Sequence, residues 1–170
     1  MATEKQVHGK TGADFMVKVE NYLEQVVQAY QAKKRWGCDT QTHNLRVESA
    51  VPGPPPKISF LFTVSENMCN SAGDLHGGCV ATLIDNFTTV LLGVISRPGF
   101  YGQLGVSRSL EVTYFRPLRQ GDEGRLICYV VNAGKTLAAL RAELYDARSG
   151  SLCAAGENDK VNTDARISKI

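Results

Sequence analysis

Residues 70–95 read NSAGDLHGGCVATLIDNFTTVLLGVI and carry the strongest structural pattern in the chain. Apolar residues recur at helical spacing from Val80 to Ile95, and small residues fill most positions between them. Asp85 is the single charged residue of that run. A helix that is apolar or small nearly all around is a buried helix. We therefore predict a buried helix here, preceded by a polar loop over about 66–74.

Two features of this stretch indicate chemistry. Gly77 and Gly78 stand where the helix is expected to begin, and backbone N–H groups there lack intrahelical partners, so they form a candidate oxyanion site. An ionised carboxylate in a core costs several kcal/mol without a partner or water, so Asp85 is a candidate functional group. Each of these residues also has a purely structural explanation when taken alone. Gly77 and Gly78 fit ordinary loop geometry, Asp85 fits a structural hydrogen bond, and His76 fits a helix cap or a core position.

The spacing of these groups predicts an assembly. Gly77 and Asp85 are eight residues apart, which is about 12 Å along a helix. A reacting carbonyl lies roughly 3 Å from its oxyanion donor, with the base at most one water away. Two antiparallel copies of the helix would bring Gly77 of one beside Asp85 of the other. We predict a site shared across a homodimer interface.

Strand patterns lie on both sides of the helix. Their approximate ranges are 43–50, 57–65, 105–115, 124–132, 136–146 and 151–161. Short loops between strands favour a meander. An amphipathic helix over about 13–35 precedes them, with Asp14 as its cap and Gly37 as its stop. We predict an α+β fold, with an antiparallel sheet around one helix. It divides into an N-terminal helical extension (1–40), a main domain (41–162) and a C-terminal tail (163–170).

Composition excludes several classes of protein. The chain has 170 residues, of which 43% are hydrophobic and 21% charged, which is typical of one globular domain. A net charge of +2 favours neither nucleic acid nor an anionic membrane. The longest mostly apolar stretch, around 90–95, is far below the roughly 18–20 residues of a membrane span. Five cysteines without CxxC spacing and three histidines predict reduced thiols and no metal site. We expect a soluble intracellular protein.

At these residues the chain resembles the hotdog-fold acyl-CoA thioesterases, in the subgroup that includes thioesterase superfamily member two and the phenylacetic-acid-degradation thioesterases. The resemblance covers about 43–160. It rests on LHGG and ATLID within 75–85, GVSRSLEVTYFRP at 105–117, the GD turn at 121–122 and GKTLA at 134–138. It implies a long helix wrapped by a six-stranded antiparallel sheet, in dimers that pair again into tetramers. The implied reaction is hydrolysis of a fatty or aromatic acyl-CoA to free acid and CoA.

The resemblance also implies residue roles. In similar enzymes the N–H matching Gly77 polarises the thioester carbonyl, assisted by the Asn matching Asn70. The residue matching His76 supports that loop. The Asp matching Asp85, from the other subunit, activates water or attacks directly, and the Ser matching Ser107 holds the water. Coenzyme A enters as part of the substrate, and no separate cofactor or metal is expected.

Basic residues at the site mouth are expected because CoA carries phosphates. The candidate substrate and CoA contacts are Gly78, Arg116, Arg119, Lys135 and Thr136. Possible walls of the acyl tunnel are Phe87, Leu91, Tyr114 and Phe115. The sequence does not fix the length of the acyl chain, nor whether the acyl group is carried by CoA or by acyl-carrier protein.

Three other functions fit the sequence. A hotdog dehydratase or hydratase also acts on acyl thioesters, but it uses a His with an acid, and the strand region holds no second catalytic His. A non-catalytic acyl-CoA-binding module would bind without turnover and leave Asp85 structural. A scaffold would use the apolar stripe of the N-terminal helix to recruit another protein.

The C-terminal residues Ser168, Lys169 and Ile170 are close to the Ser-Lys-Leu peroxisomal signal. They predict a peroxisomal location, with the cytoplasm and the mitochondrial matrix as alternatives.

Overall fold

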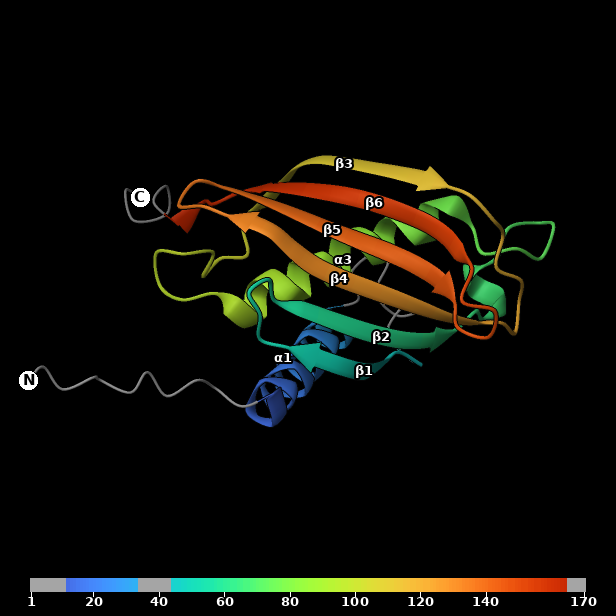
Figure 1. Cartoon of the computed structure of the whole chain (residues 1–170), viewed down its shortest axis with the longest axis horizontal. Helices are drawn as coiled ribbons and strands as arrows, with labels where there is room; N and C mark the ends of the chain where they lie inside the picture. Colours follow the sequence, from blue (N-terminus) through green and yellow to red (C-terminus); the bar gives the residue numbers. More distant parts are fainter. Residues whose placement is uncertain (1–11, 34–43, 165–170) are drawn as a thin grey trace, which may run out of the picture.

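The computed structural model describes residues 12–33 and 44–164 (Figure 1). Its elements are α1 (Gly12–Lys33), β1 (Arg46–Val51), β2 (Lys57–Thr63), the 3-10 turn η1 (Glu66–Met68), α3 (Gly77–Ile95), β3 (Val106–Tyr114), β4 (Glu123–Ala133), β5 (Leu137–Asp146) and β6 (Leu152–Val161). The predicted α+β class, both helices and all six strands are confirmed. The predicted helix stop at Gly37 and the Ser168-Lys169-Ile170 signal lie outside the described residues, so the peroxisomal location stays a prediction.

The strand order corrects the predicted meander. The six antiparallel strands follow the order β1-β2-β4-β5-β6-β3. α3 lies behind the sheet, and the chain that leaves it enters β3 at the far edge, beside β6 (Figure 1). β4 then takes the place beside β2, from Lys57 opposite Tyr129 to Thr63 opposite Glu123. β2 and β3 are not neighbours because α3 carries the chain across one face of the sheet between them.

The core lies between α3 and the sheet face that α3 covers. Burial alternates along the central strands, as expected for a sheet with one face packed on a helix. Phe60 and Phe87 meet there, with ring centroids 5.0 Å apart. Phe87 and Leu91, proposed as tunnel walls, are fully buried in this core, whereas Tyr114 and Phe115 are exposed. Within one protomer only the latter two can line an open surface.

α3 also corrects the argument about membrane spans. Among the described helices, α3 is long and apolar enough, by length and composition alone, to cross a membrane. The apolar stretch is therefore not limited to 90–95, because small and weakly polar residues extend it over the whole of α3. A core helix has the same composition, and ten α3 residues are buried in the protein. The packing of α3, rather than its length, identifies it as a core helix.

α1 packs on the same core. Its residues Phe15, Val19 and Leu23 are buried, and the helix contacts β1 and α3. A Cβ built on Gly93 of α3 would run into the ring of Tyr22 on α1, so glycine at this position leaves room for the tyrosine where the two helices meet. The apolar stripe that a scaffold function would require is therefore occupied by the chain's own core.

Candidate active site

The N-terminus of α3 is fixed by its capping residue. His76 is the N-cap, and its Nδ1 accepts a hydrogen bond from the Gly78 N–H at 2.9 Å. This contact occupies the Gly78 donor, so the structure does not support Gly78 as a direct substrate contact through its N–H. Within residues 12–33 and 44–164, the Gly77 N–H has no hydrogen-bond partner. The Cys79 N–H of the same turn also has no partner among these residues, but Gly77 lines the cleft described below and Cys79 does not, so the Gly77 N–H is the donor that can reach a ligand there.

Asn70 holds the loop in front of the helix. Its side-chain oxygen accepts hydrogen bonds from the Ala72 N–H at 2.9 Å and the Asp74 N–H at 3.2 Å. Gly73 completes this turn at φ +81°, a backbone conformation that favours glycine. Because the amide oxygen is engaged by the loop, the NH₂ end of Asn70 is the end that can donate to a substrate.

Asn70 and Gly77 open into one cleft. The cleft has a volume of about 390 Å³, and its lining includes Asn70, Gly77, Tyr114, Phe115 and Arg116. The Tyr114 hydroxyl donates to the Gly77 carbonyl oxygen at 2.8 Å and joins the end of β3 to the start of α3. We call Asn70 and Gly77 the donor half-site, because the Asn70 NH₂ and the Gly77 N–H are the hydrogen-bond donors that they present to the cleft.

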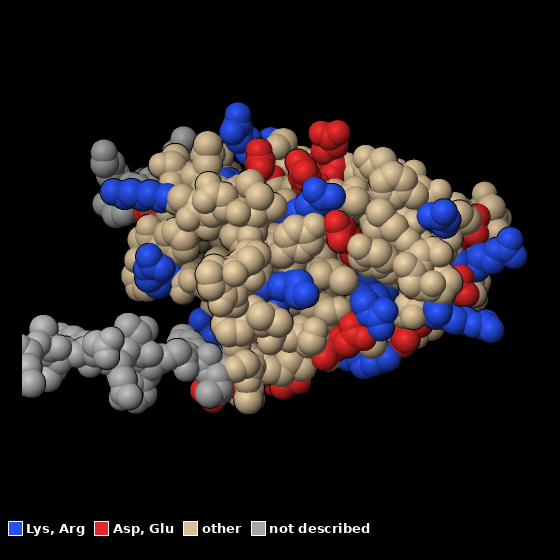
Figure 2. Space-filling view, viewed as in Figure 1, with Lys and Arg blue, Asp and Glu red and all other residues tan. Residues whose placement is uncertain are grey.

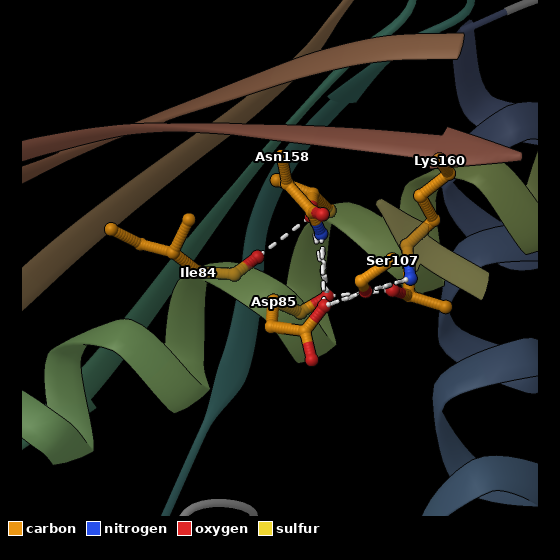
Figure 3. A network of polar contacts seen from close by, with 7 residues as sticks. Ile84, Asp85, Ser107, Asn158 and Lys160 are labelled. Carbon is orange, nitrogen blue, oxygen red and sulfur yellow. Dashed lines mark hydrogen bonds and ion pairs between the residues drawn. The ribbon is translucent and has the colours of Figure 1, made fainter. Parts of the chain in front are cut away.

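Asp85 lies outside this cleft, in a second polar cluster (Figure 3). Its Oδ1 accepts hydrogen bonds from the Ser107 hydroxyl at 2.7 Å and the Asn158 amide at 3.0 Å. The Lys160 ammonium lies 3.6 Å from the same oxygen and donates to Ser107 Oγ at 2.9 Å. The Asp85 side chain is 37% exposed, whereas that of Lys160 is 5% exposed. We call this cluster the carboxylate half-site; it holds one oxygen and leaves the other open.

A β-bulge places Ser107 in the carboxylate half-site. β3 pairs with β6, and the register shifts between Ser107 and Ser109. Ser107 stands opposite Lys160 and Leu110 opposite Asn158, and both β6 residues are buried on the side of α3. Strict alternation would put Ser107 and Leu110 on opposite faces of the sheet, so the bulge is what turns Ser107 toward Asp85.

Sequence reasoning missed Asn158 and Lys160. The strand pattern could have indicated them. Every second residue of β6 is buried, and the buried positions of Ala154 and Gly156 are followed by those of the polar residues Asn158 and Lys160. Polar side chains at buried positions of a strand require partners. The partner of both is Asp85, which is 73 residues away from Asn158 in the chain.

The predicted CoA contacts separate into two groups. Arg116 lines the cleft, and its Nη1 donates to the Leu152 carbonyl oxygen at 3.3 Å. The Arg119 N–H donates to Asp122 Oδ2 in the turn before β4. Lys135 and Thr136 lie in the β4–β5 turn, at the Val161 end of β6. About 30 Å of strand separates the two ends of β6, so one protomer does not bring the four together.

Burial suppresses the thiolate form of the described cysteines. Burial raises the pKa of the Cys79 thiol to about 11 and also raises the pKa of Cys128. A raised pKa leaves little thiolate at neutral pH. The described cysteines are free thiols, and in the same part of the chain no three His, Cys, Asp or Glu side chains are placed to hold a metal ion.

Known proteins share both the sequence pattern and the fold. A family model described as Thioesterase superfamily matches residues 72–153. Acyl-coenzyme A thioesterase 13 of Homo sapiens is 31% identical over 145 residues, which cover 85% of this chain and 97% of the relative. The zebra fish thioesterase superfamily member 2 structure has a TM-score of 0.68 at 31% identity and covers 82% of this chain and 97% of its own. That of Mus musculus has a TM-score of 0.69 at 27% identity, with coverage of 84% and 96%.

Proposed function

Since the chain belongs to the thioesterase superfamily and is an acyl-CoA thioesterase, we propose that it hydrolyses its substrate at sites shared across a homodimer. One observation carries this proposal. Each half-site is held by contacts within one protomer, yet the two functional groups, the Gly77 N–H and the Asp85 carboxylate, are separated by about 12 Å along one helix. Hydrolysis needs both at a single carbonyl, and the second protomer supplies the missing half.

Two contacts support the position of the twofold axis. Tyr114 on β3 contacts Gly77 on α3, and Ser107 on β3 contacts Asp85 on α3. The midpoint of these contacts is position 81 on the helix and positions 110–111 on the strand. A twofold axis that passes between the protomers, beside both midpoints, exchanges the two half-sites, so the donor half-site of each protomer meets the carboxylate half-site of its partner.

β3 has the properties of the dimer interface that this axis requires. It is an edge strand, with β6 on one side, and nearly all of its residues are exposed in the protomer. Val106, Leu110 and Tyr114 are among its large exposed apolar residues. A long, apolar, exposed edge strand invites pairing with a second strand. Antiparallel pairing of two β3 strands would cover this edge and continue the sheet across the dimer.

The reaction follows from the two half-sites. The Gly77 N–H and the Asn70 NH₂ hold the thioester carbonyl oxygen as negative charge develops on it. The open Asp85 oxygen of the partner takes a proton from water, whose oxygen bonds to the carbonyl carbon. The tetrahedral intermediate then collapses, the C–S bond breaks, and CoA leaves as a thiolate that regains the proton. The products are a free carboxylic acid and CoA.

Direct attack by Asp85 on the carbonyl is the alternative to water activation. It would form an anhydride, which water would then hydrolyse. A single turnover in isotopically labelled water detects the anhydride when it is hydrolysed at the enzyme carbonyl: the label then stays in Asp85, whereas activation of water places the label in the released acid and none in Asp85.

The same axis also unites the predicted CoA contacts. It exchanges the Val106 and Tyr114 ends of β3, so Lys135 and Thr136 of one protomer approach the end of its partner that holds Arg116 and Arg119. Basic residues from both protomers would then surround one site mouth, where they can bind the CoA phosphates. The pairing of dimers into tetramers remains a further prediction, which sedimentation velocity can test.

The test of the proposed function compares thiol release by the wild type and by Asp85→Asn. The substrates are short, medium, long and aromatic acyl-CoA esters. Asn keeps the size of the side chain and removes the charge, so we expect about a 10²-fold or larger fall in kcat with assembly unchanged. The matched control is Asp159→Asn, on β6 opposite Ser109, which should stay near wild type. Binding without thiol release by the wild type would instead favour an acyl-CoA-binding protein.

A further inference from the structure

We propose that Lys160 is a positioning residue of the thioesterase site, whose ammonium fixes the direction of the hydrogen bond from Ser107 to Asp85. The inference rests on the proposed role of Asp85 and adds a residue for which neither the sequence motifs nor the relatives supply a role. The Lys160 Nζ lies 2.9 Å from Ser107 Oγ and 3.6 Å from Asp85 Oδ1 (Figure 3).

The direction follows from the chemistry of the three groups. A lysine ammonium has three donors and no acceptor, so Ser107 Oγ must accept from Lys160. A hydroxyl has one hydrogen, and the Ser107 hydrogen is therefore committed to Asp85 Oδ1, 2.7 Å away. The second lone pair of Ser107 and the open oxygen of Asp85 remain as acceptors. A water molecule that donates one hydrogen bond to each of these two acceptors directs its own lone pairs away from them, toward a substrate carbonyl.

The burial of Lys160 makes this arrangement specific. Lys160 is 4% exposed, and a buried ammonium is stable only with a charged or hydrogen-bonded partner. Asp85 on α3 is the carboxylate that faces it, with Ser107 from β3 and Asn158 from β6 as the polar neighbours. Ala138, its cross-strand partner on β5, carries no charge. The charge of Lys160 is thus directed at the carboxylate half-site.

Asn158 supports a functional arrangement. Its NH₂ group donates to Asp85 Oδ1 at 3.0 Å and to Thr88 Oγ1 at 2.9 Å. Its own amide oxygen is buried and has no hydrogen-bond partner among the described residues. An unsatisfied buried oxygen is costly, and a purely structural network would satisfy it. The network instead converges on one oxygen of Asp85.

Burial lowers the pKa of Lys160, and Asp85 opposes that shift. A neutral amine can accept a hydrogen bond and no longer dictates the direction of the Ser107 hydroxyl. The activity of the wild type should therefore fall as the pH rises, and the midpoint of that fall should lie below the pKa of an ordinary lysine. Lys160→Arg keeps a permanent charge, so its alkaline fall should move to higher pH or disappear.

The main test is Lys160→Met, which keeps the length of the side chain and removes the charge. We expect kcat to fall about 10- to 100-fold with KM changed less than about threefold, because only the reacting geometry is affected. Lys57→Met, at an exposed position on β2, is the matched control and should leave both constants unchanged. Equal kcat values for the two variants would overturn the inference.

A double-mutant cycle covers the case in which Lys160→Met acts only through stability. If Lys160 acts through Ser107, then in a Ser107→Ala background Lys160→Met should cost less than about threefold. An equal loss in both backgrounds would show a separate structural effect and overturn the inference.

The outcome for Asp85→Asn separates the two proposals. An active Asp85→Asn removes the proposed function, whereas an inactive Asp85→Asn beside a fully active Lys160→Met removes only the role of Lys160.

Discussion

The two half-sites are built in opposite ways. The donor half-site forms at a short segment, 70–78, in which neighbouring residues set the turn, the cap and the exposed N–H. The carboxylate half-site takes one side chain each from α3 and β3 and two from β6, up to 75 positions apart in the chain. Its geometry depends on strand register and a bulge. The charged outer face of the sheet in Figure 2 belongs to neither half-site, which both lie on the side of α3. A local half-site tolerates changes that preserve its backbone, whereas an assembled one depends on the whole sheet.

The largest effect is expected from removing one backbone donor. Gly77→Pro deletes the Gly77 N–H at the first position of α3, where proline suits a helix. The preceding residue, His76, has φ −64° and ψ 133°, which a following proline accepts. Loss of one oxyanion donor should lower kcat about 10²- to 10³-fold. Thiol-release kinetics and the circular dichroism spectrum measure activity and fold in the same samples.

Gly77→Ala is the matched control for that variant. It keeps the N–H and adds only a Cβ, whose nearest neighbour is the Tyr114 ring at 3.4 Å, an ordinary van der Waals contact. We expect a loss of less than about tenfold, because the donor remains. Similar losses for Ala and Pro would mean that the space at position 77, rather than the donor, matters.

The next effect tests whether the two half-sites come from different protomers. Asp85→Asn and Gly77→Pro should each be nearly inactive alone. A mixed dimer contains one site with both mutations and one wild-type site, so a random mixture should recover about a quarter of wild-type activity and the purified mixed dimer about half. The two variants are co-expressed with different affinity tags, and the mixed dimer is purified through both. No recovery in a purified mixed dimer would place Gly77 and Asp85 of the same protomer in one site.

Local pattern was enough to predict most of the fold. The period of the apolar residues predicted both helices, and turn residues bounded all six strands to within three residues at each end. The strand order was beyond this reasoning, because it depends on which edge of the sheet the chain reaches after α3. No short-range signal in residues 96–105 distinguishes the two edges.

The candidate site was predictable to the same extent. Gly77 and His76 lie at the expected start of a helix, where an exposed N–H and a capping residue follow from local pattern, whereas the role of Asn70 entered through family resemblance. Ser107 entered only through family resemblance, since strict alternation places it on the wrong face without the bulge. Asn158 and Lys160 were missed because their meaning depends on Asp85, which register alone brings to them.

The smallest effect concerns His76 and separates a structural role from a catalytic one. His76→Ala removes the side chain that caps α3, and such a loss lowers the free energy of unfolding by about 0.5–2 kcal/mol. His76→Ser also removes the imidazole, but serine is itself a good N-cap, so it should restore most of that stability. Urea unfolding gives the stabilities, and thiol release gives kcat. If His76 acts only as a cap, kcat of His76→Ser should stay within about threefold of wild type. A large and equal loss of kcat in both variants, with the stability of His76→Ser restored, would show that the imidazole itself acts on the substrate.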